Sequence, residues 1–258
     1  MTLKAVEFYS GIGGMHCALE VCKLPVEVVA AYEINDVANI VYRHNFPSTS
    51  LNQRNICAIS KTELDSLNAE IWTLSPPCQP FTRLGNQNDI ADRRTDSFMH
   101  IVDLLPKLNK VPFYILVENV KGFESSEARR MFIETLQRLQ YDYRECLLSP
   151  LQFGIPNSRL RYYLLARSKC RNAFEFGNVH KINESPAELY SNSDNMNGRL
   201  GCEPSTIGEY LDSGLSQDAV ETDHMISDRD LLRCANVLDI VAPSSRRSCC
   251  FTKAYELL

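Results

Sequence analysis

Apolar runs of strand character alternate with amphipathic segments of helical character along the first 168 residues. The expected strands are residues 4–9, 26–33, 70–75, 113–120, 143–149 and 161–168. The expected helices are residues 14–22, 35–45, 95–108 and 127–140. Repeated strand–helix order is typical of an α/β fold with an open, doubly wound, mostly parallel sheet. Because no helix separates the last two strands, we expect them to form an antiparallel pair at a sheet edge.

The composition fits such a fold and argues against several other classes of protein. Of the 258 residues, 44% are hydrophobic and 23% are charged, which is ordinary for a soluble globular protein. No apolar run is long enough for a membrane helix, so we expect no membrane partner. The ten cysteines form no CxxC pair and no zinc-like cluster with histidine. We therefore expect reduced thiols, no metal, and a location in the cytoplasm, with the nucleus as an additional location.

Charge is spread unevenly along the chain. Residues 1–170 carry 19 Lys and Arg against 18 Asp and Glu, whereas residues 171–258 carry 8 against 14. A polyanionic partner would therefore dock on the first part. Strand and helix patterns also fade after residue 168, so we divide the chain into an α/β domain at 1–168 and an acidic, partly irregular region at 169–258.

A proline-rich loop carries Cys78. In the stretch SPPCQPF, Pro76, Pro77 and Pro80 fix φ and remove backbone donors, which prevents a regular helix or a central strand. The thiol is therefore held in a set direction. Taken alone, this pattern leaves two interpretations open, a buried structural cysteine and a nucleophile.

A glycine-rich turn, in the stretch EFYSGIGGMH, follows the first expected strand. It departs from the dinucleotide fingerprint, because a G-x-G-x-x-G pattern from Gly11 needs a glycine where the chain has His16. Glu33 ends the next strand, about 20 residues on, where an acid can hydrogen-bond a ribose. A nucleoside cofactor without a pyrophosphate fits both observations. The alternative for Glu33 is a surface acid.

Charged groups also come from two later strands. Glu118 closes the apolar strand at 113–117, where partial desolvation would let its carboxyl group hold or share a proton. A helix cap or a salt-bridge partner is the alternative. Arg159 and Arg161 lie two apart on an expected strand, so they share a face and could bind a carboxylate or a phosphate. The alternative is a pair of exposed edge arginines.

These groups follow the ends of expected strands, so one parallel sheet would bring them to the same rim. A thiolate, a carboxyl group, an arginine and a nucleoside cofactor suit methylation of a pyrimidine at carbon 5. Addition of the thiolate to carbon 6 makes carbon 5 nucleophilic toward a sulfonium methyl group. An acid at the ring edge stabilises the charge that develops.

Four motifs, FYSGIGG, SPPCQPF, ENV and RLR, occur in the order and rough spacing of the cytosine-5 methyltransferases, which the chain resembles. Longer stretches are similar to one branch, the tRNA(Asp) methyltransferases that look like DNA methyltransferases. These stretches are SPPCQPFTRLGNQND, LVENVKGFE, LSPLQFGIPNSRLRYY and RRSCCFTKAY. The resemblance covers nearly all of 1–168 and a short piece near 233–255. It favours the nucleophile interpretation of Cys78.

The resemblance implies a Rossmann-like methyltransferase catalytic domain at 1–168 and a partial target-recognition region at 169–258. It implies that Cys78 is the nucleophile, that Glu118 grips the base edge, and that Arg159 and Arg161 line the base pocket. Residues at the strand ends would contact S-adenosylmethionine, which leaves as S-adenosylhomocysteine. They are Phe8, Ile12, Gly13, Gly14, Glu33, Asn55, Ile56 and Ser75. For Ile56, core packing is the alternative.

The implied reaction is methyl transfer to carbon 5 of a cytosine in the anticodon loop of tRNA(Asp), through a covalent Cys78–pyrimidine intermediate. An anticodon-loop base is already unpaired, whereas a duplex base must be flipped out. The acidic balance also disfavours a long duplex footprint. We therefore expect tRNA as the partner. DNA cytosine methylation and a non-catalytic RNA-binding scaffold are the alternatives, and the sequence indicates no oligomeric state.

Families of this kind continue past the point where this chain ends, to a final Gly-Asn-Ser motif. We interpret the chain as a fragment, a splice variant or an incorrect gene model. Loss of those elements would expose apolar sheet surface and remove one wall of the methyl-donor site. We therefore expect weak cofactor binding and, at the extreme, an inactive chain. Methyl incorporation into tRNA by the purified 258-residue chain would contradict the loss of activity.

Overall fold

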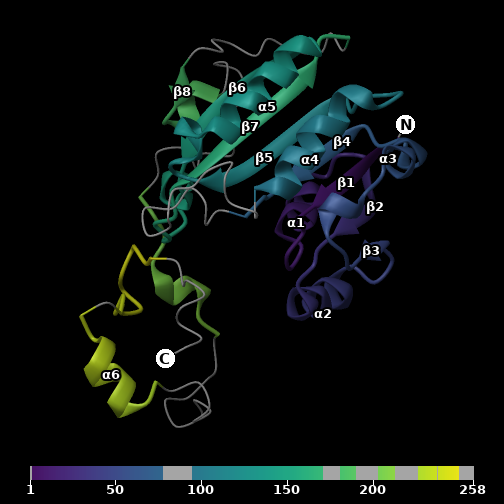
Figure 1. The fold of residues 1–258 in the computed structure, drawn as a ribbon. Helices are drawn as coiled ribbons and strands as arrows, with labels where there is room; N and C mark the ends of the chain where they lie inside the picture. The colour runs from purple at the N-terminus through teal and green to yellow at the C-terminus, as the bar shows by residue number, and fades with distance from the viewer. Residues whose placement is uncertain are drawn as a thin grey trace. The chain divides into compact units, whose positions relative to one another are not determined.

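An eight-stranded sheet organises the part of the chain that the computed structural model describes, residues 2–77, 95–170, 181–189, 203–212, 226–236 and 238–249. The strand order is β3-β2-β1-β4-β5-β7-β6-β8 (Figure 1). The strands are β1 (Leu3–Phe8), β2 (Val26–Tyr32), β3 (Leu51–Asn52), β4 (Ile71–Leu74), β5 (Tyr114–Val120), β6 (Tyr141–Leu148), β7 (Arg161–Ser168) and β8 (Ile182–Asn183).

The pairing confirms the predicted mixed α/β sheet. Strands β3, β2, β1, β4 and β5 are parallel neighbours, whereas β7 runs antiparallel to β5. The two strands predicted without an intervening helix, β6 and β7, are adjacent. The strand β7 lies between β5 and β6, and the short β8 lies beyond β6.

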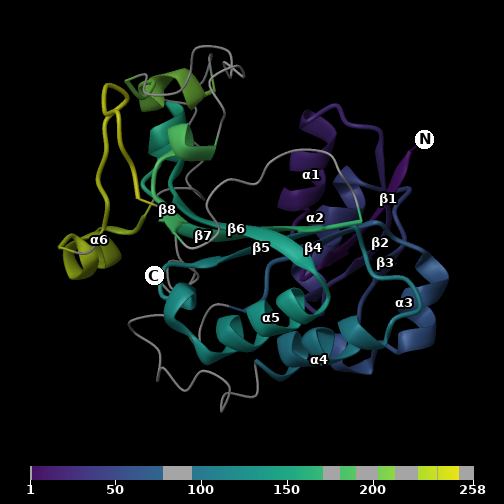
Figure 2. The ribbon, with the colours of Figure 1, turned by 90° about the horizontal axis from the view of Figure 1, so that it is seen from above.

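Helices cover both faces of the sheet (Figure 2). The α-helices are α1 (Gly14–Val21), α2 (Asp36–Asn45), α3 (Lys61–Leu67), α4 (Asp96–Leu104), α5 (Glu127–Arg138) and α6 (Asp228–Cys234). The 3₁₀ turns are η1 (Ile56–Ala58), η4 (Leu105–Lys107), η5 (Phe123–Ser125), η6 (Pro150–Phe153), η7 (Pro186–Leu189) and η8 (Ile207–Tyr210). Among the described residues, every helix is too short or too polar to span a bilayer.

Side-chain caps explain where several helices begin. Asn35 Oδ1 accepts from the backbone N–H of Ala38 at the start of α2, and Ser126 Oγ accepts from that of Arg129 at the start of α5. Such caps satisfy backbone donors that have no partner within the helix. The helix α1 differs, because it begins after Gly13 without a side-chain cap on that residue.

The main hydrophobic core lies between the sheet and helices α3, α4 and α5, whereas α1 and α2 pack on the other face. Alternate strand residues point into this core, as the pleat of a sheet requires. The strand contribution includes Val6, Phe8, Trp72, Leu74, Ile115, Val117, Tyr162 and Leu164. The helix contribution includes Leu64, Phe98, Ile101, Val102, Phe132 and Leu136.

The strands expected at 113–120 and 161–168 are present as β5 and β7, but the positions predicted for two residues on them are wrong. Glu118 does not close this strand, because β5 continues to Val120 and pairs with β7 beyond the last contact of β4 at Val117. Glu118 is therefore inside a strand. The strand β7 begins at Arg161, as expected, and Arg161 lies opposite Val120 at the end of β5. Arg159 precedes the strand, so it does not share a strand face with Arg161.

Contacts divide the chain into two compact units. The first comprises Met1–Leu147 and Arg161–Asn183, and the second comprises Leu148–Leu160 and Glu184–Leu258. In the second unit, segments far apart in sequence are hydrogen-bonded. Ser158 forms a parallel bridge with Cys249, and the backbone N–H of Ser248 donates to the carbonyl of Pro156 (2.9 Å).

The glycine-rich turn packs tightly against α2. Gly13 has φ of 95°, in the left-handed region, and a Cβ added there would lie 2.3 Å from a ring carbon of Phe46. The Phe46 ring stacks on His16, with ring centroids 3.8 Å apart and planes 7° apart. Both the backbone conformation and the close approach therefore require glycine at position 13.

This packing predicts opposite results for two adjacent glycines. Gly13→Ala should lower the free energy of unfolding by about 2–4 kcal/mol, because left-handed strain and overpacking add. Gly14→Ala is the matched control. Gly14 lies in α1 and has nothing within 4 Å of an added Cβ, so its replacement should change stability by less than about 1 kcal/mol. Urea unfolding measures both, and equal effects would contradict the packing argument.

Candidate active site

A cavity of about 640 Å³ opens where the parallel strands β1, β2 and β4 end. Ligands bind at the carboxyl ends of strands in sheets of this kind, and the volume suits a small organic ligand. The lining residues are Tyr9, Tyr32, Glu33, Ile34, Arg54, Asn55, Ile56, Cys57, Ser75, Pro77, Asp96 and Ser97.

Glu33 is held in place by two backbone donors. The N–H of Gly11 donates to Oε2 (3.0 Å), and the N–H of Asn35 donates to Oε1 (2.8 Å). A carboxylate oxygen can accept more than one hydrogen bond, so each oxygen retains capacity for a ligand hydroxyl. The contact with Gly11 also ties the glycine turn to the end of β2.

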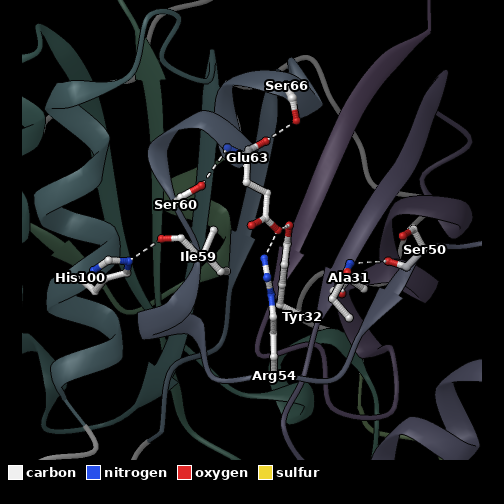
Figure 3. A network of polar contacts seen from close by, with 10 residues as sticks. Ala31, Tyr32, Ser50, Arg54, Ile59, Ser60, Glu63, Ser66 and His100 are labelled. Carbon is white, nitrogen blue, oxygen red and sulfur yellow. Dashed lines mark hydrogen bonds and ion pairs between the residues drawn. The ribbon is translucent and has the colours of Figure 1, made fainter.

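An ionic network supports one wall of the cavity (Figure 3). Glu63 Oε1 accepts from the Tyr32 hydroxyl (2.7 Å) and forms a short ion pair with Arg54. The Arg54 guanidinium lies over the Tyr32 ring, 5.7 Å from its centroid. The hydrogen bond from Arg54 to Glu63 raises the pKa of Arg54, which therefore stays charged. Two cavity residues, Tyr32 and Arg54, are thus fixed by one carboxylate from α3.

The turn η1 provides another part of the wall. Asn55 Oδ1 accepts from the backbone N–H of Cys57 (2.9 Å) and caps the turn, while Ile56 is buried. His100 of α4 lies 2.8 Å from the carbonyl of Ile59 through Nε2, a contact visible in Figure 3. The helix α4 therefore anchors η1 against the sheet.

Tyr9 links the end of β1 to the start of α4 across the cavity. Its hydroxyl donates to Ser97 Oγ (3.0 Å), and both residues line the cavity. Tyr9 has φ of 57°, an uncommon conformation for a residue other than glycine. Such strain persists only where the surroundings impose it, and it is frequent at binding sites.

Glu118 and Arg161 form an ion pair on one face of the sheet. Arg161 Nε lies 3.3 Å from Glu118 Oε1, and the side chains are 20% and 24% exposed, respectively. The last parallel pair between β4 and β5 joins Leu74 to Val117, so the next residues are Ser75 and Glu118. Cavity residue Ser75 and the ion pair therefore occupy adjacent strand positions.

Asn119 holds the start of the proline-rich loop. Its side chain is buried (1% exposed), and its Nδ2 donates to the carbonyl of Pro76 (3.3 Å). Its Oδ1 accepts from the backbone N–H of Val120 (2.8 Å). Pro76 precedes Cys78 by two residues, and Cys78 lies outside the described residues. The ENV motif therefore supplies both the carboxylate of an ion pair and an anchor for this loop.

A model of the C-5 cytosine-specific DNA methylase family matches residues 3–231. The chain belongs to this family. It is 42% identical to a tRNA (cytosine(38)-C(5))-methyltransferase of Rattus norvegicus, over 98% of this chain and 75% of that protein. It is 45% identical to one of Spodoptera frugiperda, over 99% of this chain and 71% of that protein. The structure is similar to the crystal structure of a Spodoptera frugiperda DNMT2 mutant, with a TM-score of 0.78 and 41% sequence identity. The match covers 98% of this chain and 71% of that chain.

The resemblance based on four short motifs is thereby confirmed. Half of the residues predicted to contact the cofactor line the cavity of this C-5 cytosine methylase, namely Glu33, Asn55, Ile56 and Ser75. Phe8 is fully buried and stacks on Tyr32, with centroids 5.5 Å apart. Ile12 is 61% exposed in the glycine turn, which it shares with Gly13 and Gly14. Their roles toward a cofactor stay predictions.

The predicted catalytic residues are only partly brought together in this methylase. Glu118 and Arg161 are in contact, whereas Arg159 belongs to the second unit, where its N–H donates to Ser149 Oγ (3.1 Å). Cys78 cannot be placed because it is outside the described residues. Within those residues, no group of three or more His, Cys, Asp or Glu side chains could hold a metal ion.

Several cavity residues were not predicted from the sequence, among them Tyr9, Tyr32, Arg54 and Ser97. Tyr9 and Tyr32 directly adjoin predicted site residues, so their position beside a strand end was an available signal. Arg54 adjoins the predicted residue Asn55 in the same way. Ser97 had no such signal, because its contact reaches Tyr9 across 88 positions of sequence.

A buried polar network lies on the opposite side of β1 from the core. Glu7 is 2% exposed, and the Tyr42 hydroxyl donates to its Oε2 (3.0 Å). His16 Nδ1 in turn lies 2.8 Å from the Tyr42 hydroxyl. Burial raises the pKa of Glu7 to about 7, against the opposing effects of Tyr42 and the backbone N–H groups of His16 and Met15. The strand that leads into the glycine turn therefore carries a carboxyl group whose pKa is raised to about 7.

The raised pKa of Glu7 predicts a pH-dependent stability. The folded chain keeps this proton up to about pH 7, whereas the unfolded chain releases it near 4.5, so the free energy of unfolding should fall between these values as pH rises. Glu7→Gln removes this contribution. Relative to wild type, the variant should gain about 3 kcal/mol across that window. Urea unfolding at several pH values measures the difference, with exposed Glu27→Gln as the control; parallel pH profiles for wild type and Glu7→Gln would contradict it.

Asn119→Ala should destabilise the chain because it leaves the Pro76 carbonyl and the Val120 N–H without their side-chain partner. The expected loss in the free energy of unfolding is about 1–3 kcal/mol. Exposed Asn45→Ala is the control, with a change below about 0.5 kcal/mol. Urea unfolding reports both values. A loss no larger than that of the control would mean that the loop does not depend on this contact.

Proposed function

We propose that this chain transfers a methyl group to carbon 5 of cytosine 38 in the anticodon loop of a tRNA, with tRNA(Asp) as its substrate. The observation that carries the proposal is the Glu118–Arg161 ion pair, at the strand position next to cavity residue Ser75, in a chain of the C-5 cytosine methylase family. The tRNA substrate rests on the likeness to relatives named for methylation of that base.

The donor set of the cavity fits S-adenosylmethionine. Glu33 would accept from the ribose hydroxyls, since Gly11 and Asn35 orient both of its oxygens. Tyr32 and Ile56 offer apolar surface for an adenine ring, and Asn55 lies beside them. When bound, S-adenosylmethionine supplies an electrophilic methyl group on a sulfonium centre. Further proposed contacts come from the glycine turn and the strand ends, through Phe8, Ile12, Gly13, Gly14 and Ser75.

Glu118 and Arg161 are the proposed base-binding pair. The carboxyl group of Glu118 would bind ring nitrogen 3 and the exocyclic amine of cytosine, where negative charge develops when a nucleophile adds to carbon 6. Arg161 would orient that carboxyl group and contribute positive charge to the pocket. Arg159 is proposed as a further pocket residue on the basis of the RLR motif.

Cys78 is the proposed nucleophile. Its thiolate forms a bond to carbon 6, and the displaced electron pair makes carbon 5 nucleophilic. After carbon 5 has gained its methyl group, it loses its proton to solvent or a nearby base. The electron pair of that C–H bond restores the ring double bond, and the sulfur–carbon bond to Cys78 breaks. The thiolate is regenerated and the aromatic ring recovered.

DNA is a second candidate substrate, because the matching family is named for C-5 cytosine-specific DNA methylases. The two candidates share their chemistry and differ in the cost of exposing the base. An unpaired anticodon-loop base needs no disruption of a duplex, whereas a base in DNA must be flipped out at a cost of a few kcal/mol. This difference favours tRNA.

The proposal predicts methyl incorporation that depends on both Cys78 and the target cytosine. Purified chain and radiolabelled S-adenosylmethionine are incubated with a tRNA(Asp) transcript, with the same transcript carrying uridine at position 38, and with duplex DNA. Label should enter only the first substrate, at whatever rate this chain supports, and Cys78→Ala should abolish it. Removal of a covalent nucleophile typically costs several orders of magnitude in rate.

The control variant is Cys17→Ala, which replaces an exposed cysteine outside the cavity and should leave incorporation unchanged. Label in duplex DNA but not in tRNA would favour the second candidate. If wild type and Cys78→Ala bind the transcript equally and neither transfers label, the chain acts as an RNA-binding scaffold and the enzymatic proposal fails.

A further inference from the structure

The cavity wall carries charges of both signs. Among the described residues that line it, Glu33 and Asp96 are acids and Arg54 is the single base. Glu33 follows β2 and Asp96 opens α4, so the two acids reach the cavity from separate elements. The charge that a bound ligand experiences therefore depends on whether Arg54 acts as a free cation or is neutralised.

Glu63 of α3 neutralises Arg54 from outside the cavity. Its Oε1 forms an ion pair with Nη2 of Arg54, and Glu63 itself does not line the cavity. In the part of the chain that the structure describes, no second acid forms an ion pair with Arg54. The pair cancels the base on the wall, so the two lining acids give the cavity a net negative charge.

Helix α3 and strand β2 hold this ion pair in place (Figure 3). Ser60 Oγ accepts from the backbone N–H of Glu63 (3.2 Å), and Ser66 Oγ donates to its carbonyl (2.7 Å). The Glu63 carboxylate also accepts from the hydroxyl of buried Tyr32 (2.7 Å). The Arg54 guanidinium lies 5.7 Å from the centroid of the Tyr32 ring, whose face attracts a cation. Both charges are therefore fixed relative to the cavity.

The methyl donor and its product differ in charge at one atom. S-adenosylmethionine and S-adenosylhomocysteine share the adenosine and the amino-acid tail, but only the donor carries a sulfonium cation. In a cavity of about 640 Å³, a bound ligand lies within the screening length of about 10 Å at 0.1 M salt from charges on the wall. A free cation at Arg54 would therefore weaken donor binding relative to product binding.

We propose that Glu63 determines the preference of the cavity for the methyl donor over the product, because it cancels the positive charge of Arg54 on the wall. This inference rests on the proposed use of S-adenosylmethionine. Glu63 acts through Arg54 and is therefore a positioning residue, which need not touch the ligand. After methyl transfer the sulfur is neutral, so the negative wall no longer attracts it, and the product exchanges more readily for a new donor.

Coulomb's law gives the size of the effect. Two unit charges about 8 Å apart change affinity by roughly two- to threefold at the dielectric constant of water, and by about tenfold or more at that typical of a protein surface. A purely mechanical role of Glu63 has a different signature. Loss of support for Tyr32 and Arg54 would weaken donor and product alike, because the ligands share every group except the sulfonium.

The measured quantity is the ratio of the product dissociation constant to the donor dissociation constant, obtained by calorimetry on the purified chain without tRNA. In Glu63→Gln this ratio should fall about threefold or more. The glutamine amide oxygen can still accept from the Tyr32 hydroxyl, so the substitution removes the charge and keeps the acceptor. Glu27→Gln, an exposed substitution on β2, should leave the ratio unchanged.

Arg54→Gln tests the same inference in the opposite direction. It leaves the Glu63 carboxylate without its cation, so the ratio should rise above that of wild type. The double variant removes both charges and should return the ratio to within about twofold of wild type. Raising the salt concentration to about 0.5 M should shrink both single-variant effects, because screening weakens the charges on the wall.

Distinct outcomes separate this inference from the proposed function. If Glu63→Gln weakens both ligands equally and keeps the ratio of wild type, the role of Glu63 is mechanical and the inference is overturned. It is also overturned if Arg54→Gln and Glu63→Gln shift the ratio in the same direction. If wild type binds neither ligand, the cofactor part of the proposed function fails together with the inference.

Discussion

Parallel pairing of β2, β1, β4 and β5 is the constraint on which the candidate site depends. Parallel strands end at the same rim, so residues that are distant in sequence meet there without further adjustment. Glu33 follows β2, Tyr9 follows β1, and Ser75 follows β4 beside Glu118. A shift of one residue in any pair would turn these side chains to the other face of the sheet. The register is fixed by the buried residues on the core face, so packing and site geometry have the same origin.

The sequence was sufficient for the architecture and for the family, but not for the walls of the cavity. Alternating strand and helix patterns predict most elements of the first unit, because each pattern reflects burial of one face. The apolar run at 113–117 does not show that Glu118 lies inside β5 and pairs with Arg161, since that arrangement comes from the pairing with β7. The sequence pattern also misplaces Arg159, which precedes the strand that begins at Arg161. Arg54 and Glu63 meet through tertiary contact alone, and no periodicity marks such a pair.

Burial of Glu7 illustrates how one polar group can cost stability. A carboxyl group away from water loses free energy when it ionises, and the hydrogen bond from Tyr42 offsets only part of that loss. An apolar residue of similar size would pack there without this loss. The local rule that charges stay exposed is broken at Glu7, on the strand that leads into the glycine-rich turn, and violations of this kind are expected where function rather than folding sets the residue.

The two units are interleaved along the chain, and this has a consequence for how the molecule can be divided. The backbone leaves the first unit after Leu147, returns at Arg161 and leaves again after Asn183. Within the second unit, the short excursion between β6 and β7 is hydrogen-bonded to residues almost a hundred positions later, through Ser158 and Cys249. A single peptide cleavage therefore cannot release either unit intact. During synthesis, the contact between Ser158 and Cys249 can form only after residue 249 has left the ribosome, so the second unit is completed late.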